Sequence, residues 1–207
     1  ERLSLGWVAV TLRFARLLAL SHVRVRLHAR AVAVAGAVGA LAMGVAAVAV
    51  AIGQTDLARA AAQLAIWGFL APVFAIVSHR MLPFFTASAL PFVPAWRPDW
   101  LLTVMLCALG LTALAEVSAV LWWPLPSALH AALALLQWPV GAALLWLALR
   151  WGLLHSLKVR LLAMLHGGFV WLGIAFALAG ASHALVAWRG EAASLGLAPL
   201  HALTMGY

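Results

Sequence analysis

The sequence predicts an all-α, polytopic membrane protein: a bundle of five full transmembrane helices followed by the start of a sixth. Hydrophobic residues make up 67% of the chain and charged residues only 9%, whereas a soluble domain carries roughly 25% charged residues. The mean hydropathy is +1.08. Five apolar stretches reach the length of about 20 residues that a bilayer-spanning helix needs. No stretch alternates polar and apolar residues as membrane strands do.

The predicted spans follow one another through short connections rich in turn residues. They are expected at residues 31–53, 57–79, 100–122, 127–150 and 161–187, and a sixth begins near residue 195. Pro72 and Pro139 fall inside the second and fourth spans and are expected to kink them. Pro83 is expected to end the second helix, so that Phe84 and Phe85 anchor it at the interface.

Residues 1–30 differ from the predicted bundle of residues 31–207 because six arginines interrupt their apolar pattern. Two interpretations stay open. The segment is either an amphipathic helix lying on the membrane surface or the end of a preceding helix. The chain begins with Glu1 and stops inside an apolar segment, which suggests a part of a longer protein.

The basic residues predict the orientation of the spans. If the N-terminal basic segment is cytoplasmic, eleven of the thirteen basic residues lie inside and only Arg59 and Arg189 lie outside, as the positive-inside rule requires. The net charge of +8 therefore reflects topology and a lipid bilayer as partner, and no nucleic acid is expected. The single cysteine, Cys107, excludes an intrachain disulfide.

Polar side chains inside the spans are the candidate functional residues, because an unpartnered polar group in lipid is costly. The predicted depths place them in two layers. The inner layer holds His79, Arg80 and His166, and the outer layer holds Glu116, His130, His183 and His201. Gln137 lies next to Pro139 and is expected to repair backbone hydrogen bonds there.

The layers suit a haem or a copper ion, because neutral imidazoles bind both. For a haem, the candidate ligands are His166, His183 and His201, and Arg80 would pair with an anionic group such as a propionate. For a metal ion, the candidates are His201, His166, His79 and His130. Histidines near the interface can equally bind headgroups or water, which is the alternative for His130 and His183.

Three short motifs occur in order: RMLPFFT at 80–86, LHGGFVWLGIAF at 165–176 and LHALTMG at 200–206. In these the chain resembles the NnrS family of bacterial membrane proteins, closely over 80–207 and more loosely before. The resemblance implies haem and copper, a response to nitric oxide or metal–nitrosyl species during denitrification and nitrosative stress, and the bacterial inner membrane. It also implies a protein of about twelve spans, of which this chain would be a fragment. Arg80, His166 and His201 match the motifs.

Two other functions compete with this hypothesis. A secondary transporter without a cofactor would use a midplane polar site around Glu116 and Gln137. A structural subunit would need none of the histidines. Whether any reaction is catalysed stays open, because the sequence contains no phosphate loop, no Cys-x-x-Cys pair and no nucleophile with an adjacent base.

Overall fold

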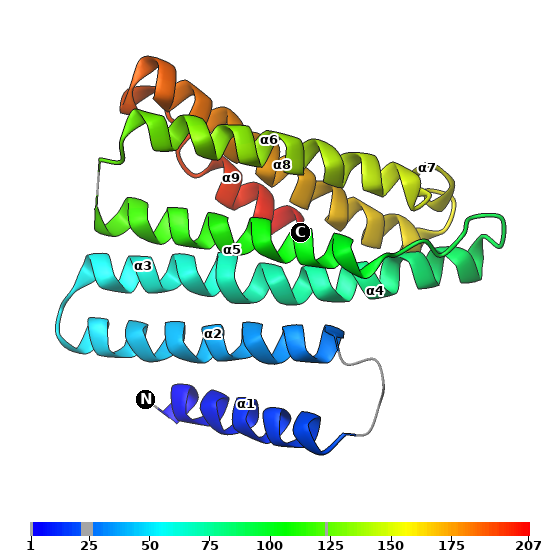
Figure 1. The fold of residues 1–207 in the computed structure, drawn as a ribbon, viewed down its shortest axis with the longest axis horizontal. Helices are drawn as coiled ribbons and strands as arrows, with labels where there is room; N and C mark the ends of the chain where they lie inside the picture. Colours follow the sequence, from blue (N-terminus) through cyan, green and yellow to red (C-terminus); the bar gives the residue numbers. More distant parts are fainter. Residues whose placement is uncertain (1, 22–26, 123) are drawn as a thin grey trace. The chain divides into compact units, whose positions relative to one another are not determined.

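The computed structural model describes residues 2–21, 27–122 and 124–207, and these are helices joined by short turns, with no strand among them (Figure 1). Five helical segments are long and apolar enough to cross a membrane: Leu27–Ala51, Thr55–Ala89, Asp99–Leu121, Ser127–Arg150 and Arg160–Arg189. The chain is therefore a multi-pass, all-α membrane protein. It divides into two compact units, residues 1–76 with 109–124 and residues 77–108 with 125–207.

The first unit contains α1 (Arg2–Leu20), α2 (Leu27–Ala51), α3 (Thr55–Ala65) and the π-helical turn η1 (Ile66–Leu70). In Figure 1, α1 runs alongside α2. The Trp7 Nε1–H donates to the carbonyl of Gly36 over 3.2 Å, and the Trp7 ring lies 5.2 Å from that of Phe69. These contacts hold α1 against the first unit, and both interpretations of residues 1–30 stay open.

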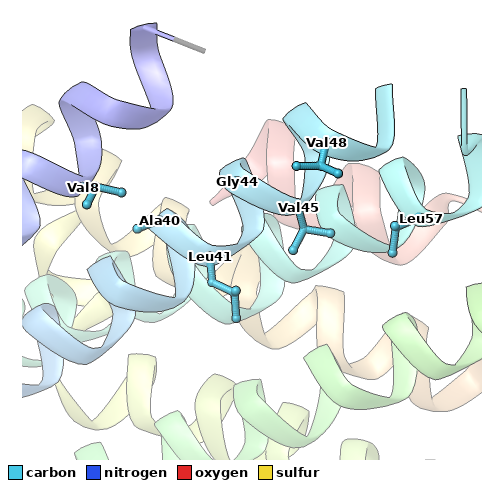
Figure 2. A pocket seen from close by; sticks show the side chains of 7 residues that line it. All are labelled: Val8, Ala40, Leu41, Gly44, Val45, Val48 and Leu57. Carbon is cyan, nitrogen blue, oxygen red and sulfur yellow. The ribbon is translucent and has the colours of Figure 1, made fainter. Parts of the chain in front are cut away.

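A hollow of about 560 Å³ opens on this unit between α1, α2 and α3. Figure 2 shows its lining, with Val8 from α1, Leu41, Val45 and Val48 from α2 and Leu57 from α3. All of these side chains are aliphatic. The hollow therefore suits a lipid acyl chain and offers no ligand to a metal or to a haem propionate.

The helix that includes the predicted second span is longer than expected. It runs through α3, η1 and α4 (Ala71–Ala89). Arg59 forms an exposed ion pair of 3.4 Å with Asp56, and the 21 residues from Arg59 to Arg80 cover about 31 Å, which matches the hydrocarbon thickness. A membrane crossing of standard thickness would therefore fit between these two arginines.

Pro83 does not end this helix, so that prediction was wrong. Pro83 lies inside α4, which continues to Ala89. A proline removes one backbone hydrogen bond, which membrane helices tolerate where polar side chains supply partners. The carbonyl that loses its donor is that of His79, four residues before Pro83. Thr86 and Ser88 donate their hydroxyls to other carbonyls, those of Leu82 over 2.8 Å and Phe84 over 2.9 Å, and the helix continues through the missing bond. Pro139 likewise lies within the continuous helix α6, and Pro72 follows the π-helical turn η1.

The second unit is organised around two antiparallel helices, α6 (Ser127–Arg150) and α8 (Arg160–Arg189), which α7 (Leu153–Ser156) connects (Figure 1). Glycines let the two backbones approach closely, as small residues do between membrane helices. A Cβ at Gly141 would lie 2.9 Å from the backbone of both Gly173 and Ala177. A Cβ at Gly180 would lie 2.6 Å from the Trp138 ring.

The chain reverses direction after α8. Gly190 adopts a left-handed conformation with φ of 84°, which glycine adopts without a Cβ penalty. The short helix η2 (Glu191–Ala193) follows, and then α9 (Ala198–His201) and η3 (Ala202–Gly206) pack against α8. This returning segment is the start of the sixth helix that the sequence predicts. The part of α5 (Asp99–Leu121) up to Ala108 also belongs to this unit.

Candidate functional site

Two histidines of the predicted outer layer meet between α6 and α8. Nδ1 of His130, in the first turn of α6, lies 2.8 Å from Nδ1 of His183, near the end of α8. The ring centroids are 5.0 Å apart. The His130 side chain is 4% exposed, whereas His183 is half-buried. At this distance one ring nitrogen donates its proton and the other accepts it.

A carboxylate that the sequence analysis did not single out completes this cluster. Oε1 of Glu191, in η2, lies 3.4 Å from Nε2 of His130. The two atoms are within ion-pair distance, but their geometry is not that of a hydrogen bond. Nε2 of His130 therefore has no hydrogen-bond partner among the described residues. We call Glu191, His130 and His183 the outer cluster. The available signal was that Glu191 is one of only five acidic residues and directly follows a glycine.

The turn after α8 holds Glu191 in place. The hydroxyl of Ser182 lies 3.2 Å from that of Ser194, and the Leu195 N–H donates to Ser182 over 3.1 Å. These contacts tie the residues that follow η2 back to the last turns of α8. The left-handed Gly190 then directs the intervening Glu191 toward α6. The outer cluster is therefore built by side chains from three elements, α6, α8 and η2.

His183 has an uncommitted ring nitrogen. The only polar contact of His183 with the described residues is the one from Nδ1 to His130. Nε2 is therefore available to a ligand. A neutral imidazole whose second nitrogen is already hydrogen-bonded is the usual state of a metal-ligating histidine.

His166, from the inner layer, is placed differently. Its side chain is fully buried, with Nδ1 3.0 Å from the carbonyl oxygen of Leu162 and Nε2 3.3 Å from that of Trp151. Both ring nitrogens thus face backbone oxygens, and because a neutral imidazole carries one N–H, only one of the two contacts is a hydrogen bond. The geometry favours a structural role for His166.

His79 and Trp151 complete this inner cluster, which we define as His79, Trp151 and His166. Nε2 of His79 lies 3.2 Å from the carbonyl oxygen of Pro98, and its ring stands edge-on to Trp151 at 6.2 Å. The Trp151 Nε1–H donates to the carbonyl of Trp96 over 2.8 Å. These contacts join the loop before α5 to the end of α6. All three side chains of the cluster are at least 99% buried.

Arg80 follows His79 in the sequence but is exposed. It forms no ion pair with any described residue. The arrangement is that of an arginine whose charged group extends to the headgroups. On α8, His166 and His183 are 17 residues apart, or about 25 Å, so the two clusters are separate sites.

His201 is exposed at the end of α9. Gly206 lies against Trp171, and the segment runs antiparallel to α8, so His201 is level with about residue 176. That level is about 10 Å from His183 along the helix. The axial nitrogens of a bis-histidine haem are much closer than this, so the structure does not present the two as such a pair.

The remaining polar candidates lie in different units. Glu116 is half-buried on the part of α5 that belongs to the first unit, and Gln137 is fully buried on α6 in the second. Over residues 2–21, 27–122 and 124–207, no group of three or more His, Cys, Asp and Glu side chains is arranged to hold a metal ion.

The comparison with protein families decides the identity of the chain. The family model described as NnrS protein matches residues 2–207. The chain belongs to the NnrS family. The match extends the resemblance seen in residues 80–207 over the N-terminal helices, which the three motifs did not cover. Comparisons of this NnrS-family chain with curated proteins and with solved structures gave no match.

Proposed function

We propose that this NnrS-family chain is a haem-binding membrane protein of the nitric oxide response, with Nε2 of His183 as the protein ligand of the iron. One observation carries the choice of ligand. His183 is a partly buried histidine with a ring nitrogen uncommitted, whereas both nitrogens of His166 face carbonyl oxygens. Haem would supply an iron that takes nitric oxide, which fits the function that the family resemblance implies.

The donor set favours haem over a copper ion held by the protein alone. Haem iron needs only one or two imidazoles, whereas a protein-bound copper ion generally needs three or more ligands. The described residues present no such group of three. Copper, which the resemblance also implies, is therefore expected only where further ligands join this chain's histidines.

The haem proposal predicts a single essential histidine. Full-length protein purified from membranes of haem-supplied cells should show a Soret absorption band, and His183→Ala should lose at least nine-tenths of it. The exposed His201 is the matched control, and His201→Ala should retain the band. Haem content is measured by the pyridine haemochrome spectrum and copper by elemental analysis.

Two results would contradict this proposal. If wild-type protein contains no haem, the haem proposal is wrong. The transporter alternative, in which proton-coupled uptake depends on Glu116, would then be tested. If haem stays bound in His183→Ala, the haem-binding function would stand, but His183 would not be the iron ligand. A band lost in His201→Ala but not in His183→Ala would assign the iron to the sixth helix.

We also propose that the protein lies in the bacterial inner membrane with its arginine-rich connections in the cytoplasm. In a Cys107→Ala background, a membrane-impermeant thiol reagent should label Ala192→Cys in intact spheroplasts. It should label Leu157→Cys only after the membrane is opened. Both positions are exposed and lie in the second unit. Labelling of Leu157→Cys in intact spheroplasts would reverse the orientation.

A further inference from the structure

We infer that Glu191 is a positioning residue which, acting through His130, fixes the proton of His183 on Nδ1 and so keeps the Nε2 lone pair free. The inference rests on the proposed function for its purpose, because a free Nε2 matters only if it binds something. The state of the His183 ring can nevertheless be measured in protein without haem. The positioning role of Glu191 and the haem proposal can therefore be refuted separately.

The first step concerns the proton on His130. The Glu191 carboxylate oxygen lies 3.4 Å from Nε2 of His130, and the His130 side chain is 4% exposed. In such a poorly screened environment a carboxylate attracts an N–H and repels a nitrogen lone pair. The tautomer of His130 with its proton on Nε2 is thereby favoured. Nε2 has no other hydrogen-bond partner among the described residues, so no other described group opposes this preference.

The second step passes the preference to His183. A neutral His130 with its proton on Nε2 has a lone pair on Nδ1. That atom lies 2.8 Å from Nδ1 of His183, a distance that requires a proton between the two nitrogens. The proton must come from His183. His183 is then protonated on Nδ1 and carries its free lone pair on Nε2.

The third step is that the fold fixes all three members of the outer cluster. Close packing at Gly141 and Gly180 holds together α6 and α8, the two helices that carry the histidines. The left-handed Gly190 and the contacts of Ser182 place Glu191. A carboxylate that accepts the second N–H of a metal-binding histidine directly is a known way to orient that ligand, and the outer cluster differs in that Glu191 faces His130 and His130 faces His183.

The test is nitrogen NMR of ¹⁵N-histidine-labelled, haem-free, full-length protein in lipid nanodiscs. Wild-type His183, assigned by its loss in His183→Gln, should show a protonated Nδ1 and an unprotonated Nε2. In Glu191→Gln, His183 should show both tautomers, because an amide can donate as well as accept. Glu191→Asp should restore the wild-type pattern in part. Asp56→Asn removes an exposed carboxylate of the first unit and should change nothing.

A double-mutant cycle identifies the route. With haem bound, Glu191→Gln should weaken haem affinity about 10- to 100-fold, as loss of a partner behind a metal ligand does. In a His130→Phe background the same change should have little further effect, because the connection is already broken. Equal effects in both backgrounds would overturn the route through His130.

An unchanged His183 tautomer in Glu191→Gln would overturn the inference even if the protein binds haem. A shifted tautomer in a protein that never binds haem would sustain the positioning role and reject the haem proposal alone. Circular dichroism and thermal unfolding of each variant separate these outcomes from misfolding.

Discussion

Gly141→Ala is expected to destabilise the second unit by about 3 kcal/mol, the upper end of the range for inserting a methyl group into a packed core. The new Cβ would lie 2.9 Å from the backbone nitrogen of Ala177 and 2.9 Å from the carbonyl oxygen of Gly173. Backbone atoms cannot rotate away as a side chain can, so α6 and α8 must separate. The separation would also lengthen the 2.8 Å contact between His130 and His183. Reversible unfolding in mixed micelles measures the first effect and haem affinity the second.

Gly167→Ala is the matched control for this change. Gly167 lies on α8, and a Cβ there would have no neighbour within 4 Å. Alanine should be neutral or slightly stabilising, because it lowers the entropy of the unfolded chain. If Gly141→Ala and Gly167→Ala have equal stability, the two helices do not approach as closely as described here.

Trp151→Ala is expected to cost about 3 kcal/mol or more and to release the loop before α5. The indole is 1% exposed, donates to the carbonyl of Trp96 and packs against Phe169 with ring centroids 5.1 Å apart. Its removal leaves a large cavity, whose cost adds to that of the lost hydrogen bond. Accelerated hydrogen exchange in residues 90–98, measured by mass spectrometry, should accompany the loss of stability.

Trp188→Ala controls for the loss of a tryptophan as such. Trp188 is 76% exposed near the end of α8, so its surroundings change little when the protein folds, and a small effect is expected. The same hydrogen exchange in residues 90–98 in wild type and Trp151→Ala would contradict the assigned role of the inner cluster. The hydrogen exchange of residues 90–98 in Trp151→Phe should be intermediate between that in wild type and that in Trp151→Ala, because phenylalanine retains an aromatic ring but not the N–H donor.

The fold could be predicted from composition because a membrane imposes strong rules on length and hydropathy. The helices Asp99–Leu121 and Ser127–Arg150 begin and end within a residue of the predicted spans. Pro83 was misjudged because the rule used for it describes a helix in water. In lipid the cost of leaving further backbone groups unpaired keeps the helix intact past the proline.

The candidate site was harder to predict, because sequence gives the depth of a side chain but not the direction in which it points. Depth alone placed His130 and His183 in one layer, and the structure brings them into contact. The same argument placed His201 with His183, but His201 is exposed and about 10 Å deeper. Glu191 escaped notice because its position depends on a turn at Gly190 that carries no metal-binding motif.

The connection between α6 and α8 has a consequence for how the protein is made. Nine residues, 151–159, separate two helices that pack over most of their length (Figure 1). Partners so close along the chain can pair soon after the second leaves the ribosome, since the loop to be closed is short. We therefore expect this pair to enter the bilayer as a preformed hairpin, with the outer cluster's two imidazoles already in register before residues 190–207 are synthesised.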